Sequence, residues 1–102
     1  MDLKSKIILI SGPTASGKSK FAVKLAKNAD ILIHEATFTH ENRDKAKEHF
    51  HSTQLQAMEI ADKAKVQRLI LTHFSQRIKD SELKEWHWNG QPCVVFNERQ
   101  IL

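Results

Sequence analysis

One stretch decides the fold of this chain: Ala29-Asp30-Ile31-Leu32-Ile33-His34-Glu35-Ala36-Thr37-Phe38. Its apolar centre, residues 31–33, is short and uncharged, which predicts a buried strand. Two polar residues, His34 and Glu35, follow directly at the carboxyl end of that strand. Ligands of parallel sheets bind beyond the carboxyl ends of the strands, so this stretch predicts both a sheet and a site at its edge.

The rest of the chain repeats short apolar runs that are separated by amphipathic stretches. Further buried strands are predicted at residues 7–10, 69–71 and 93–96. Helices are predicted at residues 18–27, 43–49 and 53–65, with a weak short helix at 81–86 and a turn at Asn89-Gly90. The order βαβααβαβ predicts an α/β fold: a small, mainly parallel sheet with right-handed crossovers and flanking helices.

The predicted helix at residues 53–65 has the clearest pattern. Its buried face is expected to carry apolar residues at every third position, namely Leu55, Met58, Ala61 and Ala64. Ser52 or Thr53 supplies the N-cap, and Gln56 is placed to close a capping box with Thr53.

Length and charge limit the possible functions. A chain of 102 residues is one domain by size. Its net charge of +4 and its pI of about 9.4 fit a partner that carries phosphates, such as tRNA or a nucleotide, although a basic solvated surface gives the same numbers. The single cysteine, Cys93, excludes an intrachain disulfide and a cysteine-rich zinc finger. No apolar run reaches membrane-spanning length and no secretion signal is evident, so a cytoplasmic protein is expected.

A phosphate-loop signature lies between the first predicted strand and helix: Gly12-Pro13-Thr14-Ala15-Ser16-Gly17-Lys18-Ser19. In such a loop Gly12 and Gly17 let the backbone wrap around phosphates, Lys18 reaches the terminal phosphates, and Ser19 offers its hydroxyl to Mg²⁺. The signature predicts a Mg-ATP or nucleotide site, and the alternative is a glycine-rich turn that binds nothing. No acidic motif that could complete a transferase site follows it.

The form of this loop, within residues 6–27, resembles the beginning of the tRNA dimethylallyltransferases. That resemblance implies an enzyme that prenylates an adenosine of tRNA. In that family the next strand contributes a catalytic acid through an Asp-Ser segment. Here the next strand leads into His34-Glu35-Ala36-Thr37 instead, so the transferase chemistry lacks its acid.

Residues 29–78 carry three motifs in order: His34-Glu35-Ala36-Thr37-Phe38, then His51-Ser52-Thr53, then Thr72-His73-Phe74-Ser75 with Arg77 close behind. Together they resemble the C-terminal part of ribonuclease Z, a zinc-dependent endonuclease of the metallo-β-lactamase fold that trims the 3′ ends of precursor tRNA. The resemblance implies half of a metallo-β-lactamase-like sandwich. The other half would cover one apolar face of the sheet, which otherwise invites dimerisation.

The resemblance also implies a role for each of four residues. His73 would ligate zinc, and Arg77 would clamp an RNA phosphate through its planar guanidinium. His51 would donate a proton to the leaving oxygen, and Glu35 would orient and charge-stabilise His51. Without the resemblance, a histidine at a strand end is more often structural, and Glu35 could be a surface acid.

The sequence departs from ribonuclease Z in ways that leave the zinc site incomplete. The motif His-x-His-x-Asp-His is absent from these 102 residues, and Pro13 stands where the family has a metal-bridging aspartate. The tyrosine that follows the family's arginine is Ile78 here. A catalytic zinc needs three protein ligands and a water, so a complementing chain would have to supply the missing ligands.

We therefore expect one domain in two parts, a P-loop βα unit at residues 1–28 and a ribonuclease Z-like segment at residues 29–102, joined by fusion of two tRNA-processing genes. The favoured function is a tRNA-processing protein of ribonuclease Z ancestry, a remnant without full activity. The alternative is a nucleotide-binding module. A third alternative is a subunit whose metal site is completed by another chain, and the uncovered apolar face of the sheet also makes a homodimer possible.

Overall fold

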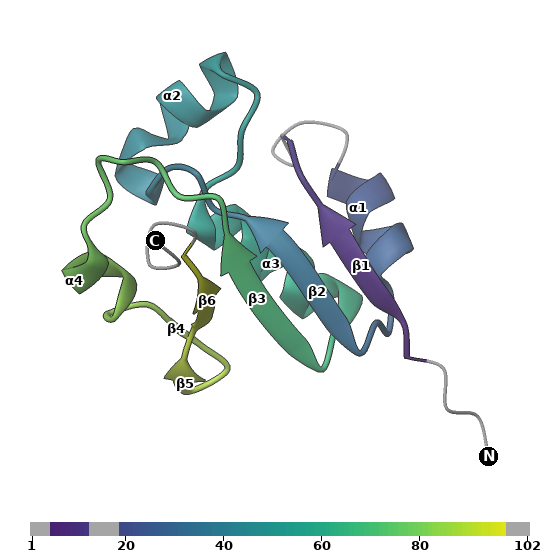
Figure 1. Cartoon of the computed structure of the whole chain (residues 1–102). Coiled ribbons are helices and arrows are strands. Elements are labelled where there is room, and N and C mark those ends of the chain that lie inside the picture. The colour runs from purple at the N-terminus through teal and green to yellow at the C-terminus, as the bar shows by residue number, and fades with distance from the viewer. Residues whose placement is uncertain (1–4, 13–18, 98–102) are drawn as a thin grey trace.

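Four parallel strands form one sheet in the order β1-β2-β3-β6 (Figure 1). The structure is a computed structural model, and it describes residues 5–12 and 19–97. The strands are β1 (Ile7–Ile10), β2 (Ile31–Glu35), β3 (Arg68–Thr72) and β6 (Val94–Phe96). The prediction of an α/β fold with a mainly parallel sheet is confirmed, and β2 extends through the two polar residues that follow its apolar centre.

Helical crossovers connect the strands. The helical segments are α1 (Ser19–Ala26), the 3₁₀ turn η1 (His40–Asn42), α2 (Arg43–Glu48), α3 (Gln54–Ala64) and α4 (Asp80–Leu83). Helices α1 and α3 pack against each other and lie behind the sheet in Figure 1. The core between these helices and the sheet is built from alanines and larger aliphatic residues, among them Ala26, Leu32, Ile60, Ala61, Leu69 and Leu71.

Helix α3 begins as its sequence predicts, and its predicted buried face is confirmed at Ala61 and Ala64 but not at Leu55. The capping box is present. The backbone N–H of Gln56 donates to Thr53 Oγ1 at 3.2 Å, and the backbone N–H of Thr53 donates to Gln56 Oε1 at 2.9 Å. The buried residues are Ala57, Ile60, Ala61 and Ala64. The prediction for Leu55 was wrong, because its side chain is 46% exposed. Residues at a constant spacing of three positions do not stay on one face of a helix that has 3.6 residues per turn. The four buried residues, at spacings of three and four, lie along one face.

A hairpin absent from the predicted order precedes the last strand. Strands β4 (His87–Trp88) and β5 (Gln91–Pro92) pair antiparallel around Asn89 and Gly90. Both turn residues have positive φ, 56° and 77°, which suits the two-residue turns that match the twist of a hairpin. The turn itself was predicted, but its flanking strands are only two residues long and too short to show a period.

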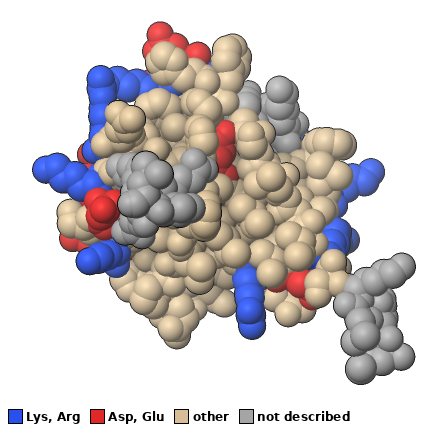
Figure 2. Space-filling view, viewed as in Figure 1, with Lys and Arg blue, Asp and Glu red and all other residues tan. Residues whose placement is uncertain are grey.

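The second face of the sheet is apolar and open. Side chains alternate between the two faces of a strand, so Leu32, Leu69 and Leu71 point to the helices while their neighbours point away. The exposed set includes Ile7, Leu9, Val94 and Phe96, each at least half exposed. Figure 2, seen from the same side as Figure 1, shows that residues other than Lys, Arg, Asp and Glu cover most of this face. Parallel sheets are normally covered on both faces, so this surface is built to be buried.

Among the described residues, no helix has the length and apolar character that a membrane crossing needs.

The two faces predict opposite responses to the same substitution. Leu32 is fully buried, so Leu32→Ala should lower the free energy of unfolding by about 2–5 kcal/mol. Leu9 is 68% exposed, so Leu9→Ala should change it by about 0.5 kcal/mol or less. Urea denaturation of the two variants measures both values. A loss at Leu9 as large as that at Leu32 would contradict an open face and would mean that another surface covers it in solution.

Candidate active site

The carboxylate of Glu35 joins three segments at the carboxyl end of the sheet. Its Oε1 accepts the backbone N–H of Gly12, which follows β1. Its Oε2 accepts the hydroxyl of Thr37 at 2.5 Å and lies 2.9 Å from Nδ1 of His51, just before α3. Glu35 is 3% exposed, so a charge that is costly to bury is stabilised here by hydrogen bonds from three partners.

Thr37 extends this network to the histidine at the end of β3. Its Oγ1 lies 2.9 Å from Nδ1 of His73 and 2.8 Å from the backbone carbonyl of the same residue. A hydroxyl has one hydrogen to donate, which Thr37 shares between the Glu35 carboxylate and the His73 carbonyl, while its oxygen accepts from Nδ1–H of the His73 ring. The imidazoles of His51 and His73 therefore share one carboxylate, the first directly and the second through a hydroxyl. Their ring centroids are 5.5 Å apart.

This arrangement leaves the same ring atom available on both histidines. His51 and His73 each use Nδ1 toward the network, which assigns the hydrogen to Nδ1 and turns Nε2 outward. His51 is partly exposed and His73 is exposed. An outward Nε2 on an imidazole whose other nitrogen is held by a hydrogen bond is suited to ligating a metal or to transferring a proton.

Hydrogen bonds to backbone carbonyls connect the loops that carry Glu35, His51 and His73. Ser52 donates its hydroxyl to the carbonyl of Gly12 at 2.7 Å, across 40 positions of sequence. Ser75 donates its N–H to the carbonyl of Thr37 at 2.9 Å. His73 adopts φ of 60°, a conformation that non-glycine residues visit at some cost and that functional sites often contain. The loops after β1, β2 and β3 and the start of α3 therefore form one connected unit.

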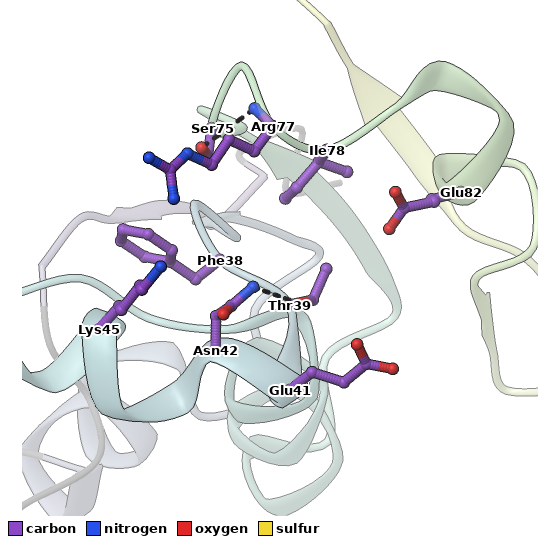
Figure 3. Close-up of a pocket in the computed structure, with 9 residues that line it drawn as sticks. All are labelled: Phe38, Thr39, Glu41, Asn42, Lys45, Ser75, Arg77, Ile78 and Glu82. Atoms are coloured by element: carbon purple, nitrogen blue, oxygen red, sulfur yellow. Dashed lines mark hydrogen bonds between the residues drawn. The ribbon is translucent and has the colours of Figure 1, made fainter.

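Arg77 lies outside the Glu35–His51–His73 cluster. It is exposed, its backbone N–H donates to Ser75 Oγ at 3.3 Å, and it lines a neighbouring pocket together with Phe38 (Figure 3). Ile78 is almost fully buried beside it. The structure thus brings together Glu35, His51 and His73, three of the four residues singled out by the ribonuclease Z resemblance. The fourth residue, Arg77, lines the neighbouring pocket.

The phosphate-loop residues are only partly described. Gly17 and Lys18 lie outside the described residues, and Ser19 begins α1. Gly12 has φ of 104°, which favours glycine, and both of its backbone polar groups are engaged, the N–H by Glu35 and the carbonyl by Ser52. β1 therefore precedes α1 as predicted, and Gly12 is tied to the Glu35 network.

Thr37 and Ser52 hold the site together, although the sequence predicts no role for Thr37 and only a possible helix cap for Ser52. Both stand inside motifs that were singled out, and a hydroxyl two residues beyond a predicted catalytic carboxylate is a signal for Thr37. Ser52 was considered only as a helix cap, and Thr53 has that role. Their partners lie 36 and 40 positions away, so no local pattern predicts these contacts.

The donor set fits part of a zinc site. Among the described residues, Glu35, His51 and His73 are the group that could hold a metal ion, with one ligand atom of each within 4.8 Å of the others. Imidazole nitrogen and carboxylate oxygen are ordinary zinc ligands. The hydrogen bond between Glu35 and His51, however, already occupies Oε2 and Nδ1. His73 is the residue best presented for ligation, which leaves a catalytic zinc short of its three protein ligands.

His34 points the other way, into the core. Side chains alternate along β2, so His34 is turned toward the helices while Glu35 joins the loops. His34 is fully buried, its Nδ1 donates to the carbonyl of Glu35 at 2.7 Å, and its Nε2 has no hydrogen-bond partner. Burial lowers the pKa of His34 below its ordinary value of 6.5, against the weaker opposing effects of the Glu35 carbonyl and carboxylate. The imidazole is therefore held neutral.

The chain is similar to known proteins in sequence and in structure. The family model of the Beta-lactamase superfamily domain matches residues 8–74. The chain is 46% identical over 100 residues to Ribonuclease BN of Proteus mirabilis (strain HI4320), covering 98% of this chain and 32% of that protein. It is 49% identical over 98 residues to Ribonuclease Z of Listeria monocytogenes serotype 4a (strain HCC23), covering 96% of this chain and 31% of that protein.

Solved structures agree with these matches. The crystal structure of human tRNase Z, short form, superposes with a TM-score of 0.63 at 46% identity, over 76% of this chain and 29% of that one. The long form RNase Z from yeast gives 0.60 at 31% identity, over 79% and 11%. The chain spans about a third of the length of the curated relatives it matches. The family match begins at residue 8 and therefore includes the segment from β1 to α1. The comparisons thus do not show a fusion with a tRNA dimethylallyltransferase, which stays a prediction.

The neutral state of His34 predicts acid sensitivity. Because its folded pKa lies below the unfolded value, the unfolded chain binds the extra proton first, and stability should fall as the pH drops below about 6.5. Urea denaturation at a series of pH values between 7.5 and 5 measures this slope. His34→Gln should flatten it, whereas His87→Ala, at an exposed position, should not. An unchanged slope in His34→Gln would assign the effect to other groups.

Proposed function

The chain belongs to the Beta-lactamase superfamily domain family and has ribonuclease Z ancestry, and from this premise we propose that it is a tRNA-processing protein with an incomplete site for hydrolysis of precursor tRNA. The observation that carries the proposal is the chain of contacts from His51 through Glu35 and Thr37 to His73. A carboxylate that orients an imidazole is the usual arrangement for acid–base catalysis.

Each residue has one proposed role. His51, as the imidazolium with its Nδ1–H held by Glu35 at 2.9 Å, donates its Nε2 proton to the leaving oxygen of the cleaved phosphodiester and is left as the neutral Nδ1–H tautomer. His73, oriented by Thr37, contributes an imidazole ligand to zinc. Arg77 holds an RNA phosphate with its guanidinium. The family's metal, when bound, supplies an activated water and polarises the phosphate.

The chain by itself is proposed to be catalytically silent. The 102 residues contain no His-x-His-x-Asp-His motif, and the Glu35–His51–His73 cluster presents too few free ligand atoms for a catalytic zinc. The missing ligands would come from another chain seated on the open apolar face, which includes Leu9 and Val94. A homodimer would cover that face but would add no new type of ligand.

Complementation tests this function. The chain alone should not cleave precursor tRNA with zinc or manganese. Mixed with a ribonuclease Z fragment that carries the His-x-His-x-Asp-His motif, it should cleave at the 3′ end. In the mixture His51→Ala should lower the single-turnover rate by about 10²–10⁴-fold, because a general acid contributes that much. His87→Ala, at an exposed histidine outside the cluster, is the matched control.

Two results would overturn the proposal. Turnover by the chain alone would show that its site is complete. Equal rates for His51→Ala and His87→Ala in the mixture would remove His51 from the chemistry.

A second candidate function is Mg-ATP binding at residues 12–19, with Gly12, Gly17, Lys18 and Ser19 as contacts. It is supported by the position of the signature between a strand and a helix, since β1 ends at Ile10 and α1 begins at Ser19. The Glu35 carboxylate at the N–H of Gly12 opposes it, because a negative charge there repels phosphate and occupies one amide of the loop.

These opposing effects make a paired test. If the loop binds Mg-ATP, the nucleotide should raise the melting temperature of the chain, Lys18→Ala should abolish the shift, and Glu35→Gln should enlarge it. A shift that survives Lys18→Ala would dismiss the loop as the binding site.

A further inference from the structure

The pocket drawn in Figure 3 has a volume of about 160 Å³ and lies next to the Glu35–His51–His73 cluster. The two sites share a wall, because Phe38 lines the pocket and its ring centroid is 6.1 Å from that of His51. The volume is below the roughly 300–1,000 Å³ of pockets for drug-sized ligands, so the pocket suits one fragment of a larger ligand.

The pocket has a basic side and an acidic side. Figure 3 shows the guanidinium of Arg77 and the side chain of Lys45 directed toward the ring of Phe38. The carboxylates of Glu41 and Glu82 lie on the other side of the hollow in the same view. Lys45 comes from α2, Arg77 from the loop after β3, and Glu82 from α4, so only the fold brings these charges around one aromatic ring.

We propose that this pocket binds the nucleotide next to the cleaved bond, with its phosphate between Lys45 and Arg77 and its base against Phe38. Glu41 and Glu82 then accept hydrogen bonds from an exocyclic amino group of the base. The site thus prefers adenine, cytosine and guanine over uracil. This inference rests on the proposed function for the identity of its ligand as RNA.

The basic side determines where the phosphate lies. Arginine and lysine hold phosphate oxygens, arginine through a planar fork and lysine as a point charge. An aromatic ring beside them gives a base a surface on which to stack, whatever its sequence. Phe38 is partly buried, and its ring also stacks with His49 at 6.1 Å between centroids, so the stacking surface is held in place.

The acidic side determines which base is accepted. Carboxylates accept from the exocyclic amino groups of adenine, cytosine and guanine, whereas uracil has no such group and presents a carbonyl oxygen, a second acceptor, in the place of the amino group of cytosine. A second hollow, of about 360 Å³, continues from the same two glutamates and adds Glu85. Backbone phosphates are repelled from that direction, which orients the nucleotide with its phosphate toward Lys45 and Arg77.

Binding of mononucleotides to the full chain tests the pocket without metal or cleavage. NMR titrations with 5′-CMP and 5′-UMP should give about tenfold tighter binding of 5′-CMP. Lys45→Ala and Arg77→Ala should weaken both nucleotides about equally. The double substitution Glu41→Gln and Glu82→Gln should remove most of the preference and leave phosphate binding intact. Phe38→Ala should weaken both by roughly tenfold, as loss of base stacking predicts.

The chain supplies matched controls for each change. Lys47, on the same helix as Lys45, is exposed and does not line the pocket, so Lys47→Ala should bind as the unchanged chain does. Phe50 is 72% exposed outside the pocket, so Phe50→Ala controls for loss of an aromatic ring. Lys45 and Arg77 are exposed, so their substitution leaves the core unaltered and carries the test if Phe38→Ala fails to fold.

The outcomes separate this inference from the proposed function. Equal affinity for 5′-CMP and 5′-UMP, or binding that Lys45→Ala and Arg77→Ala leave unchanged, would overturn the pocket assignment even if the complemented mixture cleaves tRNA. Selective binding that depends on Lys45 and Arg77 would support it even if complementation fails.

Discussion

The buried carboxylate of Glu35 is the interaction on which the rest of the site depends. A charge taken from water costs several kcal/mol unless hydrogen bonds replace the lost hydration. Glu35 accepts such hydrogen bonds from the backbone amide of Gly12, the hydroxyl of Thr37 and the imidazole of His51, each on a different segment. The loops must therefore close around it together, and removal of the carboxylate would release all three. The same contacts orient His51 and, through Thr37, His73.

The parallel sheet explains why these segments meet. Its strands all point the same way, so the residues after β1, β2 and β3 leave the sheet at one edge. Alternation along β2 then separates two adjacent polar residues, with His34 sent into the helix-covered core and Glu35 into the loops. The same edge carries the pocket of Phe38, Lys45 and Arg77. The residues proposed for acid–base chemistry and those proposed for nucleotide recognition thus lie at the same end of the sheet, with Phe38 between them.

Much of this could be predicted from local pattern and resemblance. The four sheet strands, the capping box at Thr53 and the motifs that carry Glu35, His51 and His73 all follow from short stretches of sequence. The buried face of α3 was predicted only in part, because a three-residue spacing departs from the helical period of 3.6 residues. Ala61 and Ala64 are buried as predicted, whereas Leu55 is exposed. The hairpin β4–β5 was missed because two-residue strands have no readable period.

The sequence by itself determined the four strands of the main sheet, the main helices, their order and the residue types available for chemistry, because strand, helix and cap preferences act over a few neighbouring positions. Only the tertiary structure decided which of those residues touch. Thr37 reaches His73 across 36 positions and Ser52 reaches Gly12 across 40. Lys45 of α2 and Glu82 of α4 line the same pocket. Such contacts arise from strand register and loop closure, which depend on the packing of the whole chain and leave no local pattern to read.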